Sequence, residues 1–266
     1  MKRLFVQNID ASDVVSDQIV MPSDDDIAIA SLLNAEGKNS VEAWFMGEER
    51  MFNGTMTQVR NAAVARDVGQ YTRSLAGGPA TPTHEIIPVG TGHALQTARY
   101  YYNFNRQGST DWTLAAVLQL GDLSAGTNTS LFGWQPGGTG ENLPSMNLTD
   151  DGTIRAWRYA NQQTPTIFIA GAVPNIRTQP YLILISQSRT RGAVCRVNGV
   201  TVYTNSFSNG LAPSTGTAVA WLGSDVSSAS FNGIVFSAIL CNEDVTPDPY
   251  KLATIEGGLM RKYGLA

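Results

Sequence analysis

Short apolar segments of strand length recur along this chain from residue 40 onward, and glycine-rich or polar turns separate them. The strongest single signal is Asn198-Gly199 between two β-branched runs, because Asn-Gly supplies the two positive φ angles of a type I′ hairpin turn. A second hairpin is predicted within residues 146–157, with Asp151-Gly152 at its turn. Many short strands joined by such turns predict an all-β sandwich or jelly roll.

A short helix is predicted before these strands, near residues 24–36. Ser23 and Asp26 have the spacing of a capping box, and acidic residues suit the positive end of a helix dipole. Three consecutive aspartates at 24–26 also suggest a calcium loop, although such loops place their ligands at alternate positions. We therefore predict a helix start here, with the calcium loop as the alternative.

A second helix is predicted at the C-terminal end of the chain. Leu252, Ile255 and Leu259 fall on one helix face at spacings of three and four residues. Gly264 has the position of a residue that ends a helix, and Leu265 is then able to fold back on the helix face.

Charged residues make up only 15% of the 266 residues, and the formal net charge is -4. A chain with this balance of charges lacks the basic surface that nucleic-acid binding requires, so no nucleic-acid partner is expected. No apolar run is long enough to span a membrane, and none follows Lys2-Arg3, so neither a membrane partner nor a signal peptide is predicted. We expect residues 1–20 to form an extended N-terminal arm and residues 21–266 to form one domain.

Cysteine and histidine are too scarce to suggest a redox or zinc site. Cys195 and Cys241 lie inside apolar strand-like runs, which predicts buried free thiols. His84 and His93 lie in segments with the composition of loops, and a zinc site needs more ligands than they provide. The glycine-rich segment 137–140 lacks the following helix and Lys-Ser/Thr pair of a phosphate-binding loop. No cofactor is expected.

The order of elements in the last third of the chain carries a family resemblance. The Asn-Gly hairpin is followed by a strand with Trp221-Leu222-Gly223, a long strand over 231–240, a polar loop and a helix ending Lys262-Tyr263-Gly264-Leu265. This order, over about residues 85–265, resembles the concanavalin A-like, laminin-G-type jelly-roll domain of bacterial surface proteins and of tailed-phage structural proteins. The resemblance implies a concanavalin A-like jelly-roll sandwich whose final strand packs beside its first strand.

Glycosidases of this superfamily carry carboxylates in the pattern E-x-D-x-x-E on one strand, so that acid and nucleophile face the same groove. This chain contains no such pattern, and Glu48 and Glu49 are adjacent, so a strand would direct them to opposite faces. We therefore expect no enzymatic activity. Two carboxylates could still meet across neighbouring strands, which keeps a glycosidase or depolymerase as the third functional hypothesis.

Aromatic residues flanked by amides are the candidates for binding a glycan, because sugars stack on exposed rings and their hydroxyls bond to amides. The candidate residues are Trp134, Gln135, Asn142, Trp157, Tyr159 and Asn161. In β-sandwiches such rings also fill the core or an oligomer interface, and this alternative stays open. Calcium bound by loop carboxylates occurs in parts of the family, and Asp150, Asp151 and Asp225 would be its ligands here.

The resemblance, the missing catalytic motif and the small uncharged polar residues together suggest a function. The main hypothesis is a non-enzymatic virion surface protein of a tailed phage, as a capsid decoration, tail-fibre or baseplate subunit. Its expected partners are other virion subunits, including copies of itself, and the virion is the expected location. The alternative is a carbohydrate-binding module that recognises a host-surface glycan.

Overall fold

A computed structural model provides the fold. It describes residues 24–33, 41–45, 49–52, 55–59, 73–74, 86–89, 92–98, 101–107, 111–121, 128–135, 145–160, 164–173, 175–188, 190–205, 217–222, 232–241 and 243–265. The predicted arm at residues 1–20 and the cap residue Ser23 lie outside the described residues.

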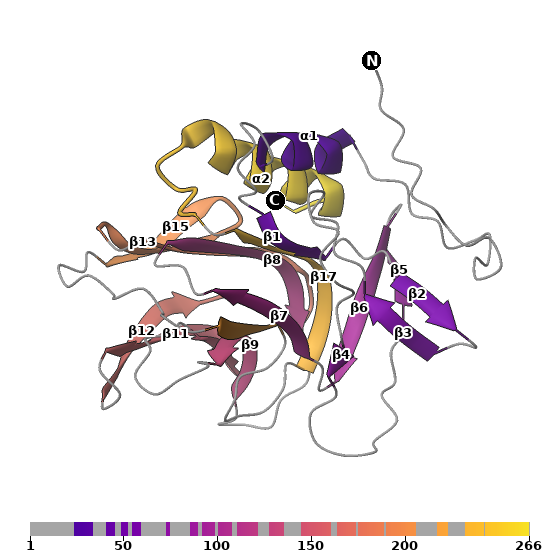
Figure 1. The fold of residues 1–266 in the computed structure, drawn as a ribbon, viewed down its shortest axis with the longest axis horizontal. Coiled ribbons are helices and arrows are strands. Elements are labelled where there is room, and N and C mark those ends of the chain that lie inside the picture. Colours follow the sequence, from indigo (N-terminus) through magenta and orange to yellow (C-terminus); the bar gives the residue numbers. More distant parts are fainter. Residues whose placement is uncertain are drawn as a thin grey trace.

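An eight-stranded antiparallel sheet forms one layer of the molecule (Figure 1). Its strands are β1 (Val41–Phe45), β5 (Ile86–Val89), β6 (Gly92–Ala98), β8 (Trp112–Leu120), β13 (Tyr181–Ser188), β14 (Gly192–Val197), β15 (Val200–Asn205) and β17 (Asn232–Cys241). Their order is β15-β14-β13-β8-β17-β6-β5, and β1 pairs with the second half of β17. The last strand thus lies beside the first, as the resemblance implies.

A seven-stranded antiparallel sheet forms the second layer. Its strands are β4 (Arg73–Ser74), β7 (Tyr101–Gln107), β9 (Asn128–Gln135), β10 (Ser145–Thr149), β11 (Thr153–Ala160), β12 (Thr164–Ala172) and β16 (Thr217–Leu222). Their order is β12-β11-β10-β9-β16-β7-β4. A separate small hairpin contains β2 (Glu49–Phe52) and β3 (Thr55–Val59). The predicted all-β sandwich is therefore confirmed.

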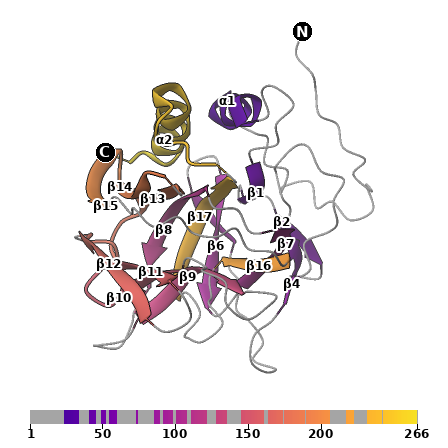
Figure 2. The same cartoon turned by 60° about the vertical axis from the view of Figure 1, so that its left-hand side comes forward.

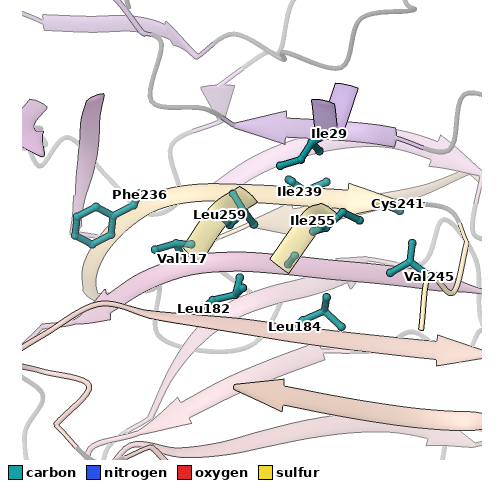
Figure 3. Close-up of a cluster of buried hydrophobic side chains, with 11 residues drawn as sticks. Ile29, Val117, Leu182, Leu184, Phe236, Ile239, Cys241, Val245, Ile255 and Leu259 are labelled. Atoms are coloured by element: carbon teal, nitrogen blue, oxygen red, sulfur yellow. The ribbon is translucent and has the colours of Figure 1, made fainter. Parts of the chain in front are cut away.

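Two helices, α1 (Asp24–Leu33) and α2 (Pro249–Tyr263), form a third layer on the eight-stranded sheet (Figures 1 and 2). A cluster of buried side chains joins the helices to the sheet (Figure 3). We call it the helix-side cluster: Ile29, Ala115, Val117, Leu182, Leu184, Phe236, Ile239, Cys241, Val245, Ile255 and Leu259. The predicted apolar face of α2 is confirmed, and its third member, Leu252, packs against this cluster.

This helix layer explains the continuous apolar run at the start of β13. Leu182 and Leu184 belong to the helix-side cluster, whereas Ile183 and Ile185 alternate with them and are also buried. The strand is buried on both faces because helices cover one face and the second sheet covers the other. In the part of the chain that the structure describes, no helix is both long and apolar enough to cross a membrane.

Both ends of α2 are capped, and the cap at Gly264 is the one that the sequence predicts. At the N-terminus, the backbone N–H groups of Tyr250 and Lys251 donate to the Asp248 carboxylate, each at 3.0 Å. At the C-terminus, Gly264 adopts a φ of 62°, which glycine adopts without steric strain. The backbone N–H of Leu265 then donates to the Met260 carbonyl at 2.9 Å, so the chain folds back on the helix.

Helix α1 covers Asp24–Leu33, and the last three residues of the predicted helix, 34–36, lie outside the described residues. The Asp25 carboxylate accepts from Arg261 at 2.5 Å, and that of Asp26 accepts from Lys262 at 2.9 Å. Asp26 and Lys262 are largely buried, with side chains 3% and 10% exposed. The calcium-loop alternative is therefore wrong, because these carboxylates lie on a helix and join α1 to the last turn of α2.

The two predicted hairpin turns are confirmed. Asn198 and Gly199 have φ values of 43° and 76°, as a type I′ turn requires. Gly152 has a φ of 82° in the turn between β10 and β11. The prediction of a loop at His93 is wrong, because His93 lies on β6 and pairs with Pro88. Gly90 and Thr91, between the two strands in sequence, lie outside the described residues.

Two adjacent glycines of α2 provide a test of how closely α1 packs. A Cβ at Gly258 would lie 3.0 Å from Ile29 Cδ1, whereas one at Gly257 would meet the flexible end of Arg261 at 3.1 Å. Alanine improves helix propensity at both sites by about 1 kcal/mol. We expect Gly257→Ala to raise the free energy of unfolding by that amount, and Gly258→Ala to lower it by about 1 kcal/mol through overpacking. Urea denaturation measures both, and equal effects would contradict the close packing of α1 on α2.

Candidate functional site

One face of the seven-stranded sheet packs against the eight-stranded sheet, and buried residues identify it. Leu148 and Ile154 pair across β10 and β11, and both are 0% exposed. Because successive residues of a strand alternate between faces, these two positions mark the inner face. The pairing register then extends the assignment to the neighbouring strands.

The two faces differ in composition. Inner-face positions hold mostly apolar residues: Tyr102, Phe104, Phe132, Trp134, Met146, Ala156, Ala218 and Ala220. Three arginines, Arg73, Arg106 and Arg158, also occupy inner-face positions. The opposite positions, which we call the outer face, hold mostly amides, hydroxyls and aromatic residues: Asn103, Asn105, Gln107, Gln135, Ser145, Asn147, Trp157, Tyr159, Thr217 and Trp221. The same face also holds Arg155, Gly133 and the apolar residues Pro165, Ile167, Ile169 and Val219. This alternation is typical of an antiparallel sheet with one face in the core and one polar face.

One row across the outer face places small residues between two tryptophans. Trp157 pairs with Ser145 in β10. Gly133 in β9 pairs with Trp221, which in turn pairs with Asn103. Neighbouring strands lie about 4.8 Å apart, so the tryptophan positions on β11 and β16 are separated by about 14 Å. This row, with the amides beside it, is the candidate site.

The structure separates the residues that the sequence analysis grouped as glycan-binding candidates. Gln135, Trp157 and Tyr159 occupy outer-face positions. Trp134 occupies an inner-face position opposite Ala220, so it does not share a face with Gln135. Asn142 and Asn161 lie outside the described residues. The pairing of Trp134 with Gln135 in one site was wrong, because adjacent strand residues belong to opposite faces.

Sequence reasoning missed several positions that the register brings to the same face. The sequence places Trp221 in a predicted strand, and it assigns no role to Asn103 or Asn105. The alternation of Tyr102 and Phe104 with these two asparagines was a usable signal of a strand with one polar face. The proximity of Trp221 to the β9–β11 strands had no sequence signal, because it depends on strand order.

The proposed calcium ligands have structural partners where they are described. The hydroxyl of Thr149 and the backbone N–H of Thr153 both donate to Asp151 Oδ1, which holds the hairpin turn. The neighbouring backbone carbonyl of Asp150 accepts from Arg177 at 2.7 Å. Asp225 lies outside the described residues. Among the described residues, no group of three or more His, Cys, Asp or Glu could hold a metal ion.

The buried carboxylates lie on the helix side of the molecule and bind cations or hydroxyls. Asp244 accepts from the Ser186 hydroxyl at 2.6 Å and from Arg191 at 2.7 Å. Glu256, 5% exposed, accepts from Arg196 at 2.7 Å. These contacts attach α2 and the loop before it to the eight-stranded sheet. A stabilising role therefore accounts for both carboxylates.

The thiols are also structural. Cys195 and Cys241 are buried and free, as predicted. Burial raises the pKa of the Cys195 thiol to about 12, because the charged thiolate loses its hydration. Near neutral pH this thiol is protonated and is not a nucleophile.

The described strands of the seven-stranded sheet contain no carboxylate pair of the kind that a glycosidase uses. Within the bounds given above, these strands contain no aspartate and no glutamate. A glycosidase needs two carboxyl groups on one groove, one to protonate the leaving group and one to act as nucleophile or base. The row from Trp157 to Asn103 can therefore stack rings and form hydrogen bonds, but its strand residues offer no such pair.

No protein-family model and no curated protein sequence matches this chain. Solved structures that are similar to it include the three that follow. One is domain 4 of AbnA, an extracellular arabinanase of Geobacillus stearothermophilus, in complex with arabinotriose. It is 13% identical, and the match covers 82% of this chain and 98% of that domain with a TM-score of 0.57. Trypanosoma rangeli sialidase in complex with sialic acid is 12% identical, with 85% of this chain and 33% of the sialidase covered and a TM-score of 0.56.

The third structure is the binding domain of Paraclostridial Mosquitocidal Protein 1. It is 8% identical, and the match covers 84% of this chain and 53% of that domain with a TM-score of 0.56. The chain thus spans about a third of the sialidase and about half of the mosquitocidal binding domain. At these identities the likeness shows a shared sheet-rich, lectin-like sandwich fold.

Proposed function

We propose that this chain is a non-catalytic carbohydrate-binding module and that its site is the outer face of the seven-stranded sheet. The observation that carries the proposal is the shared row of Trp157 and Trp221, with Asn103 at its end. The apolar face of a sugar ring packs on an aromatic ring, and sugar hydroxyls bond to amide groups. Ser145 and Gly133 between the tryptophans leave room for a ligand chain to lie across the strands.

The similar structures support this proposal by analogy of fold. The AbnA domain, which the match covers almost completely, was solved in complex with arabinotriose. A fold supports many functions, so the analogy adds weight only because the outer face of this chain has suitable residues. The sialidase match covers a third of that enzyme, and hydrolysis is not part of the proposal.

The virion role stays a prediction. The three structures named above are a domain of an arabinanase, a sialidase and the binding domain of a mosquitocidal protein, and none of these three is a virion protein. A carbohydrate-binding module could be carried by a phage tail or by a secreted enzyme. Mass spectrometry of purified particles distinguishes these settings, but the binding chemistry proposed for the outer face is the same in both.

The proposal predicts that two tryptophans carry the affinity for glycans. We expect Trp157→Ala and Trp221→Ala each to weaken binding by about tenfold or more, as for aromatic anchors at other binding sites. A glycan array identifies ligands, and calorimetry with the best soluble oligosaccharide measures the affinities. Tyr250→Ala is the control, because Tyr250 is 72% exposed and lies on α2, across the eight-stranded sheet from the site.

Two outcomes would contradict the proposal. Folded protein that binds no glycan on the array would rule out the function. Glycan binding that both tryptophan variants retain at full strength would place the site elsewhere. Circular dichroism of each variant shows whether a lost affinity reflects a lost fold.

A further inference from the structure

We infer that the glycan bound by the outer face is anionic, with Arg155 binding its carboxylate. This inference rests on the proposed function and names the class of sugar. It begins from the distribution of charge. The whole chain has 22 acidic and 18 basic residues, so a sheet of average composition would contain both signs.

The strands of the seven-stranded sheet, within their described bounds, contain charges of one sign only. They hold arginines and no lysine, aspartate or glutamate: Arg73, Arg106, Arg155 and Arg158. The carboxylates of the described ion pairs instead lie on α1, on α2 and in the loop before α2. An anionic ligand on the outer face would therefore meet no like charge from the strands themselves, and the aspartates of the β10–β11 turn, Asp150 and Asp151, lie at the end of that hairpin.

The register places one of these arginines on the outer face. Arg155 pairs with Asn147, and both alternate with the buried Leu148 and Ile154. The other three arginines occupy inner-face positions: Arg73 and Arg106 through the register of β7, and Arg158 by alternation along β11. Among the described strand residues, Arg155 is therefore the one charged residue at an outer-face position.

The spacing between Arg155 and Trp157 suits a sugar with a carboxyl group on its ring. The two residues are two apart on β11, so they share a face at a separation of about 7 Å along the strand. A ring stacked at Trp157 would have its edge near Arg155. The planar guanidinium forms paired hydrogen bonds with a carboxylate, and Asn147 opposite it can bond to the adjoining hydroxyls.

The test compares each acidic polysaccharide with its own carboxyl-reduced form. The probes are polygalacturonate, alginate and polysialic acid, each beside the reduced polymer of the same length. We expect at least one acidic polymer to bind about tenfold or more tightly than its reduced form, which is the scale of one hydrogen bond to a charged group. That preference should weaken as salt screens the charges.

Arg155→Gln should abolish the preference, so that the acidic polymer binds only as tightly as its reduced form. Arg261→Gln is the matched control, because it removes the same charge from α2 and should leave the preference intact. Trp157→Ala should weaken binding of both forms. The three variants therefore separate charge recognition from ring stacking.

Several results would overturn the inference. Equal binding of acidic and reduced polymers, or binding of neutral glycans alone, would contradict it while leaving the carbohydrate-binding function intact. Binding of oligothymidylate as tight as that of the best acidic polymer would show a general polyanion surface instead. If no glycan binds the folded protein, the proposed function and this inference fail together.

Discussion

Replacing Leu259 with alanine is expected to lower the free energy of unfolding by about 3 kcal/mol, the middle of the range for a buried leucine. Leu259 is 0% exposed and lies in the helix-side cluster, between α2 and the eight-stranded sheet (Figure 3). Two costs add together, because the truncated side chain loses its transfer free energy and leaves a cavity. Ile29 and Ile255 line the same cluster from both helices, which limits how far the cavity can close.

Urea denaturation of the variant and of the unmodified protein measures this loss. Leu252→Ala is the matched control, since Leu252 lies on the same helix but is only partly buried, and its loss should be about 1 kcal/mol. Equal losses would contradict the packing described for α2. Glycan affinity of the folded Leu259 variant should be unchanged, because the eight-stranded sheet lies between this cluster and the outer face.

The features that the sequence predicted correctly are those set by local chemistry. The φ angles at Asn198 and Gly199 depend on the turn itself, and the end of α2 depends on Gly264 and the chain just before it. Glycine and asparagine at such positions indicate the backbone conformation without knowledge of any distant partner. The burial of the two thiols was also predictable from local sequence, because each cysteine lies within an apolar strand.

The candidate site was less predictable because it depends on strand order and register. Trp157 and Trp221 are distant in sequence and meet on one row only because β9 and β10 lie between their strands. A shift of one residue would move every side chain of a strand to the opposite face. Trp134 shows the consequence, because the amide beside it suggested a binding position whereas the register gives it an inner-face position.

The few charged residues of this chain are unevenly distributed between the two sides of the sandwich. The described ion pairs join the helices to each other, to the loop before α2 and to the eight-stranded sheet: Asp25–Arg261, Asp26–Lys262, Glu243–Lys251, Arg196–Glu256 and Arg191–Asp244. Carboxylates are used there for stability, and the strands of the opposite sheet lack them. The ion pairs that stabilise the fold and the residues proposed to bind a glycan therefore lie on different sides of the sandwich. Variants can test stability and binding separately.

Replacing Gly152 with alanine is expected to lower the free energy of unfolding by about 3 kcal/mol, from backbone strain and a clash together. Gly152 has a φ of 82°, and a Cβ there would lie 2.6 Å from the Val173 carbonyl oxygen. That oxygen belongs to backbone, which cannot move aside as a flexible side chain can. The shift needed would break the 3.0 Å hydrogen bond from Val173 N–H to the Gly152 carbonyl.

Gly264→Ala separates the two contributions, because Gly264 has a similar φ of 62° but nothing within 4 Å of an added Cβ. We expect it to cost only the strain, about 1 kcal/mol, in the same urea denaturation. Equal costs for the two variants would contradict the contact with Val173. Gly152 also sets the register of β10 against β11, which aligns Asn147 with Arg155 and Ser145 with Trp157. The Gly152 variant should therefore lose glycan affinity as well, whereas the Gly264 variant should retain it.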